Sequence, residues 1–106
     1  MYIAWTSVAE LEDAERLASE IITRHLAACV QIEGPLKALY RWEGRIESAA
    51  EYRLCIKCLE SQLSALETYI LRHHPYSIPE WVVTRADHVA EKYLSWAVSV
   101  SKSSTL

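Results

Sequence analysis

The stretch that decides the fold is Leu36–Cys58, which reads LKALYRWEGRIESAAEYRLCIKC. Two runs rich in aliphatic, aromatic and β-branched residues meet at Glu43-Gly44. Because glycine tolerates the positive φ of a tight hairpin turn, the pattern predicts a β-hairpin with its two-residue turn at that point. Apolar and charged side chains alternate along the second run, so we expect the two faces of the hairpin to have different surroundings.

The second run of this hairpin is long for so small a chain. A strand from Ile46 to Cys58 would extend about 40 Å at roughly 3.3 Å per residue, whereas a compact chain of this size has a radius of gyration of about 13 Å. We therefore expect the hairpin to project beyond its own domain, with Tyr40, Trp42 and Ile46 at the far end. A lone two-stranded ribbon is marginal in water, so the pattern favours an obligate oligomer. The alternative is a bent or bulged strand that folds back on one core.

The composition limits the class of protein. With 106 residues, of which 51% are hydrophobic, the chain is expected to form one domain over residues 1–106. The net charge of −3 argues against a nucleic-acid partner. We expect no membrane association and no signal peptide, because no apolar run approaches the roughly 18 residues of a membrane span and the amino terminus is strand-like. Three cysteines cannot all pair, which favours a reducing cytoplasm.

The first half of the chain predicts a strand, a helix and a second strand. Tyr2–Trp5 is apolar enough to be central in a sheet, and Ser7 with Glu10 has the spacing of a capping box for the helix that follows. A second buried strand is predicted over Ala27–Ile32. Since proline has no N–H for a ladder, we expect a bulge or kink at Glu33-Gly34-Pro35.

After the hairpin, the pattern predicts a second helix that Ser61 caps and that ends at His73-His74, before Pro75. A last central strand is expected at Trp81–Thr84 and a short helix at 90–98. Residues 99–106 are expected to be a frayed tail.

This order of elements predicts an α+β ferredoxin-like βαββαβ sandwich, with an antiparallel sheet, an extended hairpin and a short C-terminal helix. Both main helices are expected on one face of the sheet. The other face then needs a cover, which is a second argument for association of copies.

Four segments resemble one known family. The segments HLAACVQI at 25–32, YRWEGRIE at 40–47, HPYSIPE at 74–80 and YLSW at 93–96 are similar, in the same order, to motifs of the CutA divalent-cation tolerance proteins. The resemblance implies a ferredoxin-like fold assembled as a homotrimer, with an architecture similar to PII signalling proteins. It also implies a role in tolerance of copper and other divalent cations.

Three cysteines and two histidines are the candidate metal ligands. Cys55 and Cys58 form a CxxC, but residues three apart on a strand point to opposite faces, so we expect structural thiols there. Cys29 is interpreted as either a buried inert thiol or a soft ligand for weakly bound copper, with His74 or His25 as helpers.

A polar pocket between subunits is the main site hypothesis, built from Trp42, Lys57, His74, Tyr76 and Glu80. Prolines at 75 and 79 would hold the loop that carries the last three. Lys57 with protonated His74 would favour an anion, whereas Glu80 with neutral His74 would favour a cation. The alternative is a plain salt bridge between Lys57 and Glu80.

The leading functional hypothesis is a trimer without enzymatic activity that binds copper, another divalent metal or a small anion between subunits. No nucleophile–base motif is present, and two glycines cannot form a glycine-rich phosphate loop. One alternative is a hydrolase of the acylphosphatase type, which would need an arginine that Thr6–Ala9 lacks. The others are a PII-like small-molecule signal protein and an RNA-binding module, for which Tyr52 alone is insufficient.

Overall fold

The computed structural model of the chain describes residues 1–102. Its elements follow the predicted order, with a helix after the last strand: β1 Tyr2–Val8, α1 Leu11–Thr23, β2 Cys29–Trp42, β3 Arg45–Cys58, α2 Glu60–His73, β4 Val82–Arg85 and α3 Glu91–Ser101. The strands form one sheet in the order β2-β3-β1-β4, and every neighbouring pair is antiparallel. This is the ferredoxin-like α+β arrangement that the sequence predicts.

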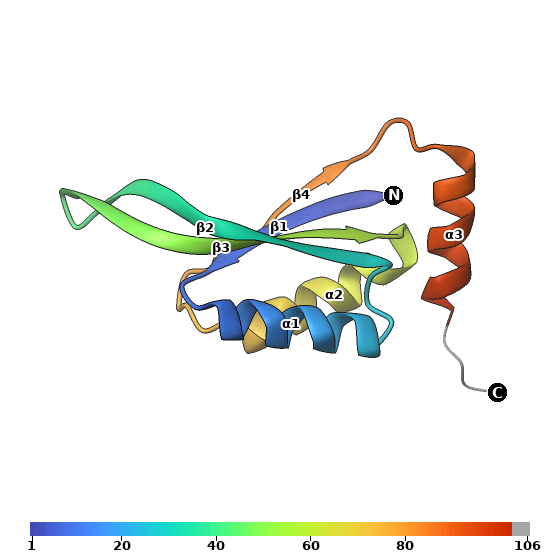
Figure 1. Cartoon of the computed structure of the whole chain (residues 1–106), viewed down its shortest axis with the longest axis horizontal. Helices are drawn as coiled ribbons and strands as arrows, with labels where there is room; N and C mark the ends of the chain where they lie inside the picture. Colours follow the sequence, from blue (N-terminus) through green and yellow to red (C-terminus); the bar gives the residue numbers. More distant parts are fainter. Residues whose placement is uncertain (103–106) are drawn as a thin grey trace.

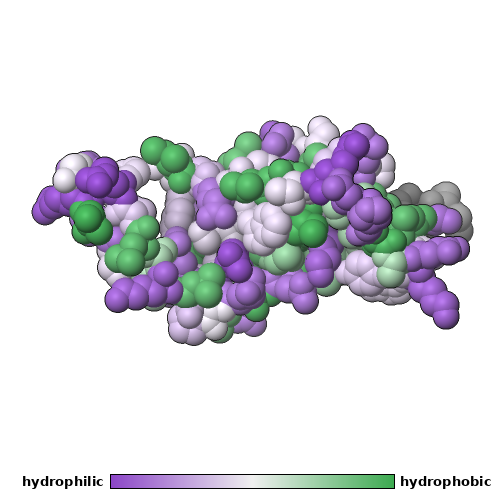
Figure 2. Space-filling view, turned by 90° about the horizontal axis from the view of Figure 1, so that it is seen from above, coloured by the Kyte–Doolittle hydropathy of each residue, from purple (hydrophilic) through white to green (hydrophobic). Residues whose placement is uncertain are grey.

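The helices α1 and α2 cover one face of the sheet, and no helix of the described residues 1–102 covers the opposite face (Figure 1). The core lies between the sheet and these helices, and its fully buried side chains include Leu17, Ile21, Leu54, Ile56 and Leu66. Seen from the side away from α1 and α2, hydrophobic side chains form separate patches among hydrophilic ones (Figure 2). The face that needs a cover is therefore of mixed character rather than a continuous apolar surface.

The β2–β3 hairpin projects from the body, as its length predicts (Figure 1). Its turn has positive φ at Glu43 (48°) and Gly44 (77°), the backbone of a type I′ hairpin turn. The molecule measures 50 × 29 × 21 Å, so the hairpin makes it much longer than it is thick. The hairpin tip exposes large apolar side chains, with 68% of Leu39 and 72% of Ile46 accessible.

The predicted bulge is present in β2, where the pairing with β3 shifts register between Glu33 and Leu36. The strand nevertheless continues on both sides of the bulge, so β2 is one strand rather than a short strand followed by a hairpin arm. Gly34 lies in this bulge with φ 150°, and an added Cβ would meet the Glu51 carbonyl oxygen at 2.9 Å.

Two predictions about where helices begin and one about the place of a strand in the sheet are wrong. Ser7 is buried inside β1, because pairing with β3 extends to Val8, and α1 begins only after Glu10. At α2 the cap residue is Leu59 rather than Ser61, and its backbone N–H donates to Oε1 of Gln62 at 2.8 Å. The strand β4 lies at an edge of the sheet instead of its centre.

The carboxyl-terminal part is more regular than its composition predicts. The helix α3 runs to Ser101 and is followed by Lys102, so residues 99–101 of the expected frayed tail are helical. Residues 103–106 of that tail lie outside the described residues. This helix stands at the end of the sheet remote from the hairpin tip (Figure 1). In the part of the chain that is described, no helix has the length and apolar character needed to cross a bilayer.

Candidate functional site: a pocket beside the hairpin

A cavity of about 630 Å³ lies between the hairpin and the loop that follows α2. We call it the hairpin pocket and define it by the aromatic and charged residues that line it, which are Tyr40, Trp42, Glu51, Tyr76 and Glu80. The remaining lining residues are small, aliphatic or serine side chains. Three of the five predicted ligand-binding residues, Trp42, Tyr76 and Glu80, thus lie around one pocket of a single chain.

A hydrogen-bond network holds the carboxylate of Glu51 at the pocket wall. The hydroxyl of Tyr76 donates to Oε2 of Glu51 at 3.0 Å, and the hydroxyl of Ser7 lies 3.4 Å from the same oxygen. Burial and the neighbouring Glu51 raise the pKa of Tyr76 to about 12, so this hydroxyl keeps its proton at neutral pH. The carboxylate is therefore fixed in place by a neutral donor, which leaves its charge uncompensated.

His74 lies beside the pocket, and its ring joins the loop that follows α2 to β1 through hydrogen bonds. Its Nδ1 accepts a hydrogen bond from the backbone N–H of Tyr76 at 3.0 Å, so the ring proton is on Nε2. Nε2 then donates to the carbonyl of Ser7 at 3.0 Å and lies 3.0 Å from the Thr6 hydroxyl. Burial lowers the pKa of His74, although the hydrogen bond to Ser7 partly opposes this. A metal ion could bind His74 only by replacing one of these contacts.

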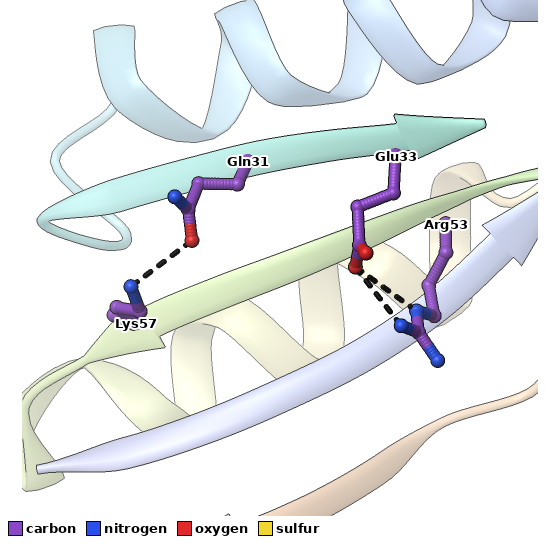
Figure 3. Close-up of polar contacts among 4 residues, drawn as sticks. All are labelled: Gln31, Glu33, Arg53 and Lys57. Atoms are coloured by element: carbon purple, nitrogen blue, oxygen red, sulfur yellow. Dashed lines mark hydrogen bonds and ion pairs between the residues drawn. The ribbon is translucent and has the colours of Figure 1, made fainter.

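Lys57 lies apart from the other predicted pocket residues of its own chain. It pairs with Ile3 of β1 and Cys29 of β2, at the end of β3 that is remote from the hairpin tip. Its Nζ donates to the side-chain oxygen of Gln31 at 3.0 Å (Figure 3) and lies 5.8 Å from the ring centre of Tyr93. The alternative of a salt bridge between Lys57 and Glu80 is not formed within residues 1–102.

Neighbouring side chains on the uncovered sheet face are also paired. Arg53 donates to Oε1 of Glu33 through Nε at 3.2 Å and Nη2 at 3.0 Å (Figure 3). Arg53 is two residues from Glu51 in β3, but it is paired with Glu33 and so does not neutralise the Glu51 carboxylate.

The cysteines do not form a metal site within the chain. Cys58 is fully buried in the core, and burial raises its pKa to about 11, whereas Cys55 lies on the opposite face as expected for a CxxC in a strand. Cys29 is half-buried in β2, which is an edge strand rather than the buried strand predicted over Ala27–Ile32. Among residues 1–102, no three histidine, cysteine or acidic side chains gather in a way that could hold a metal ion.

Sequence reasoning missed Glu51 and Tyr40 as pocket residues. Glu51 is one of several charges on one face of β3, and the sequence alone does not say which of them meets the loop at 76–80. The sequence feature that points to Glu51 is the alternation of apolar and charged residues along β3. This alternation places Glu51 on the face opposite the core side chains Leu54 and Ile56.

The family model described as CutA1 divalent ion tolerance protein matches residues 2–100. This chain belongs to the CutA1 family. Among curated CutA relatives, the chloroplastic CutA 1 protein of Oryza sativa is 35% identical over 102 residues, and the chloroplastic CutA of Arabidopsis thaliana is 33% identical over 94 residues. The matched segments cover 96% and 89% of this chain but only 58% and 52% of those two proteins. A Yersinia pestis divalent-cation tolerance protein CutA is 40% identical over 78% of this chain and 70% of its own length.

Solved CutA1 structures share the fold over nearly the whole chain. The Pyrococcus horikoshii CutA1 structure superposes with a TM-score of 0.92 at 31% identity and covers 97% of this chain and 100% of its own. The Oryza sativa CutA1 structure gives 0.90 at 35% identity, over 97% and 94% of the two chains. CutA membership is therefore supported by sequence and by three-dimensional structure.

Proposed function

We propose that this CutA1 protein acts as a homotrimer without enzymatic activity in the response to metal ions, and that it binds its metal between subunits. The observation that carries the proposal is the projecting hairpin, because its tip exposes the apolar side chains of Leu39 and Ile46 beyond the body of its own chain. A neighbouring copy offers such side chains burial, and the uncovered face of the sheet needs a partner as well.

The distribution of donor groups supports a shared metal site. The described residues of one chain bring no three suitable side chains together, so one chain does not fit a metal ion by itself. We propose weak copper binding in which Cys29 supplies a thiolate from each of several copies, because soft thiolates suit Cu(I). His74 is the weaker candidate, since both ring nitrogens already have partners.

A small anion in an intersubunit pocket is the second candidate, and it depends on Lys57. Within one chain the charged groups at the hairpin pocket are the carboxylates of Glu51 and Glu80. An anion there would need Lys57 from a neighbouring copy, which would complete the five-residue pocket predicted from Trp42, Lys57, His74, Tyr76 and Glu80. A structure of the assembled protein with bound phosphate would test this directly, and it fails if Lys57 stays remote from the pocket in the assembly.

The metal proposal is tested by anaerobic Cu(I) titration of the wild type and of Cys29→Ser. The matched control is Cys58→Ala, because the Cys58 thiol is buried in the core and its raised pKa disfavours the thiolate. We expect Cys29→Ser to lower the affinity at least about tenfold, which corresponds to the loss of a thiolate ligand. Equal affinities of the wild type and Cys29→Ser would exclude Cys29 as a ligand.

A further inference from the structure

Cys29 and Cys55 lie at neighbouring positions across the β2–β3 ladder. Cys29 pairs with Lys57, and Gln31 pairs with Cys55, so the two cysteines occupy diagonal positions of successive pairs on one face of the sheet. This is the face opposite the core, because Ile56, between the two pairs, is fully buried in the core. Both cysteines are half-buried free thiols.

The spacing of this thiol pair suits a bridging metal ion better than a disulfide. Diagonal neighbours in an antiparallel sheet lie roughly 7–8 Å apart at Cα, whereas disulfides usually join residues whose Cα atoms are about 4.4–6.8 Å apart. An ion between two sulfurs adds two bonds of about 2.3 Å each, the length of a zinc–thiolate bond, where a disulfide adds one S–S bond of about 2.05 Å. One soft cation therefore joins the two thiols without a change of the ladder.

Lys57 supplies a positive charge beside this thiol pair. It lies directly opposite Cys29 and two residues from Cys55 on the same face. Its Nζ donates to Oε1 of Gln31 at 3.0 Å (Figure 3) and lies 5.8 Å from the ring centre of Tyr93 in α3. A Cu(I) ion held by two or more thiolates carries a net negative charge, because each thiol loses its proton to solvent on binding. The ammonium of Lys57 compensates that charge.

The charges around Cys55 act on its thiol. Burial raises the pKa of Cys55, and the positive charge of Lys57 partly opposes this. Glu33 and Arg53 also act on this pKa, in opposite directions, and they pair with each other at 3.0 Å. A charge on Cys29 raises the pKa of Cys55 further, so the two sulfurs are close enough to interact. A bound cation removes this repulsion between the two thiolates.

We propose that each copy contributes two thiolates to the shared copper site, Cys55 as well as Cys29, with Lys57 as the charge that compensates them. The inference rests on the proposed copper site at Cys29 and names a further ligand of that site. It does not depend on exposure to solvent, because a neighbouring copy over this face would shield the bound ion from water. With two thiolates from each copy, a contact between copies brings together the ligands that residues 1–102 of one chain do not gather alone.

The test is an anaerobic Cu(I) titration in competition with the chelator bathocuproine disulfonate. The matched pair of variants is Cys55→Ala and Cys58→Ala, because Cys58 lies in the same strand on the core face. We expect Cys55→Ala to lower the Cu(I) affinity at least about tenfold, since even residues outside the ligand shell are typically worth that much. It should also weaken the ultraviolet thiolate-to-copper absorption per bound ion, which reports ligation rather than folding. Cys58→Ala should match the wild type in both measurements.

Cys29→Ser, measured in parallel, separates this inference from the proposed copper site. If Cys29→Ser lowers the Cu(I) affinity and Cys55→Ala does not, the copper site stands and the inference about Cys55 is wrong. If neither variant lowers the affinity, the copper site and the inference fail together. Equal losses in Cys55→Ala and Cys58→Ala would also overturn the inference, because the effect would then be structural.

Lys57 is tested by one substitution that removes its charge and one that keeps it. We expect Lys57→Gln to lower the Cu(I) affinity about fivefold at low salt and less at high salt, which is the scale of one exposed ionic contact. Lys57→Arg should bind like the wild type. Equal affinities of Lys57→Gln and the wild type at low salt would contradict the role given to Lys57. The molar mass and the circular dichroism of each variant are recorded, and Cys55→Val, which suits a strand, replaces Cys55→Ala if that variant misfolds.

Discussion

At the scale of single residues, Gly34 is the position where the backbone leaves least freedom. Its φ of 150° is unfavourable for other residues, and an added Cβ would lie 2.7 Å from Cδ1 of Tyr52. We expect Gly34→Ala to lower the free energy of unfolding by about 1–3 kcal/mol, measured by urea denaturation at fixed protein concentration. Gly44→Asn is the control, because nothing lies within 4 Å of its Cβ and asparagine tolerates positive φ. Equal urea midpoints for Gly34→Ala and the wild type would contradict this account of the bulge.

The partly buried His74 leads to a prediction about how the stability of the fold depends on pH. Burial lowers its pKa in the folded protein from the ordinary value of 6.5, so the unfolded chain binds more protons at mildly acidic pH. The stability that neutral His74 contributes is therefore complete above pH 6.5 and is lost as the pH falls through the lowered pKa. Between about pH 7.5 and about pH 5.5, the melting temperature should fall more for the wild type than for His74→Gln.

The exposed neighbour of His74 supplies the control. His73→Gln should retain the wild-type pH dependence, because His73 lies on the outer surface of α2 against Tyr69. If His74→Gln and the wild type lost the same stability on acidification, protonation of His74 would not be the cause.

His74 and Glu51 show what local sequence patterns can and cannot predict, because His74 was predicted as a site residue and Glu51 was not. The polar motif at 74–80 identifies His74, Tyr76 and Glu80 as a group, and the structure places Tyr76 and Glu80 around one pocket with His74 behind them. Glu51, which accepts the hydrogen bond of Tyr76, could not be predicted from a local pattern. It is 25 residues away in sequence, and only the register of the sheet brings it to Tyr76. The same holds for Gln62, whose side chain joins the start of α2 to the carbonyl of His25.

At the scale of elements, the hairpin was predictable because its determinants are local. The Glu43-Gly44 turn and the alternation along Arg45–Cys58 determine its turn and its faces without reference to the remainder of the chain. The cap at Ser7 and the central position of β4 were predicted wrongly, since both depend on long-range pairing. Val8 pairs with Tyr52 and keeps Ser7 in a strand, while β4 pairs only with β1 in the described part of the chain.

The exposed apolar side chains of the hairpin tip lead to a prediction about the strength of assembly. Leu39 and Ile46 lie on the same face of the hairpin at diagonal positions, since Leu39 pairs with Ser48 and Arg41 with Ile46. We expect Ile46→Glu to raise the concentration at which the assembly dissociates at least about tenfold, because a carboxylate would be buried in an apolar contact. Leu71→Glu, on the exposed side of α2, is the matched control. Analytical ultracentrifugation measures both, and unchanged dissociation of Ile46→Glu would show that the tip stays in solvent.

At the scale of the whole molecule, the structure has an uncovered sheet face and a hairpin that extends past the body that carries it. Both features place polar and apolar groups where only another molecule can contact them. The expectation of assembly comes from the sequence, because β3 is longer than the body of one chain can cover. The proposed number of three copies rests instead on the family resemblance, because no local pattern in the chain encodes it.

The measurement that tests this account most directly is the molar mass in solution, from light scattering on a sizing column over a tenfold range of protein concentration. The account predicts a single species of about three times the chain mass of 12.1 kDa at every concentration. A species of 12.1 kDa that does not change with concentration would contradict the trimer and the shared metal site that depends on it.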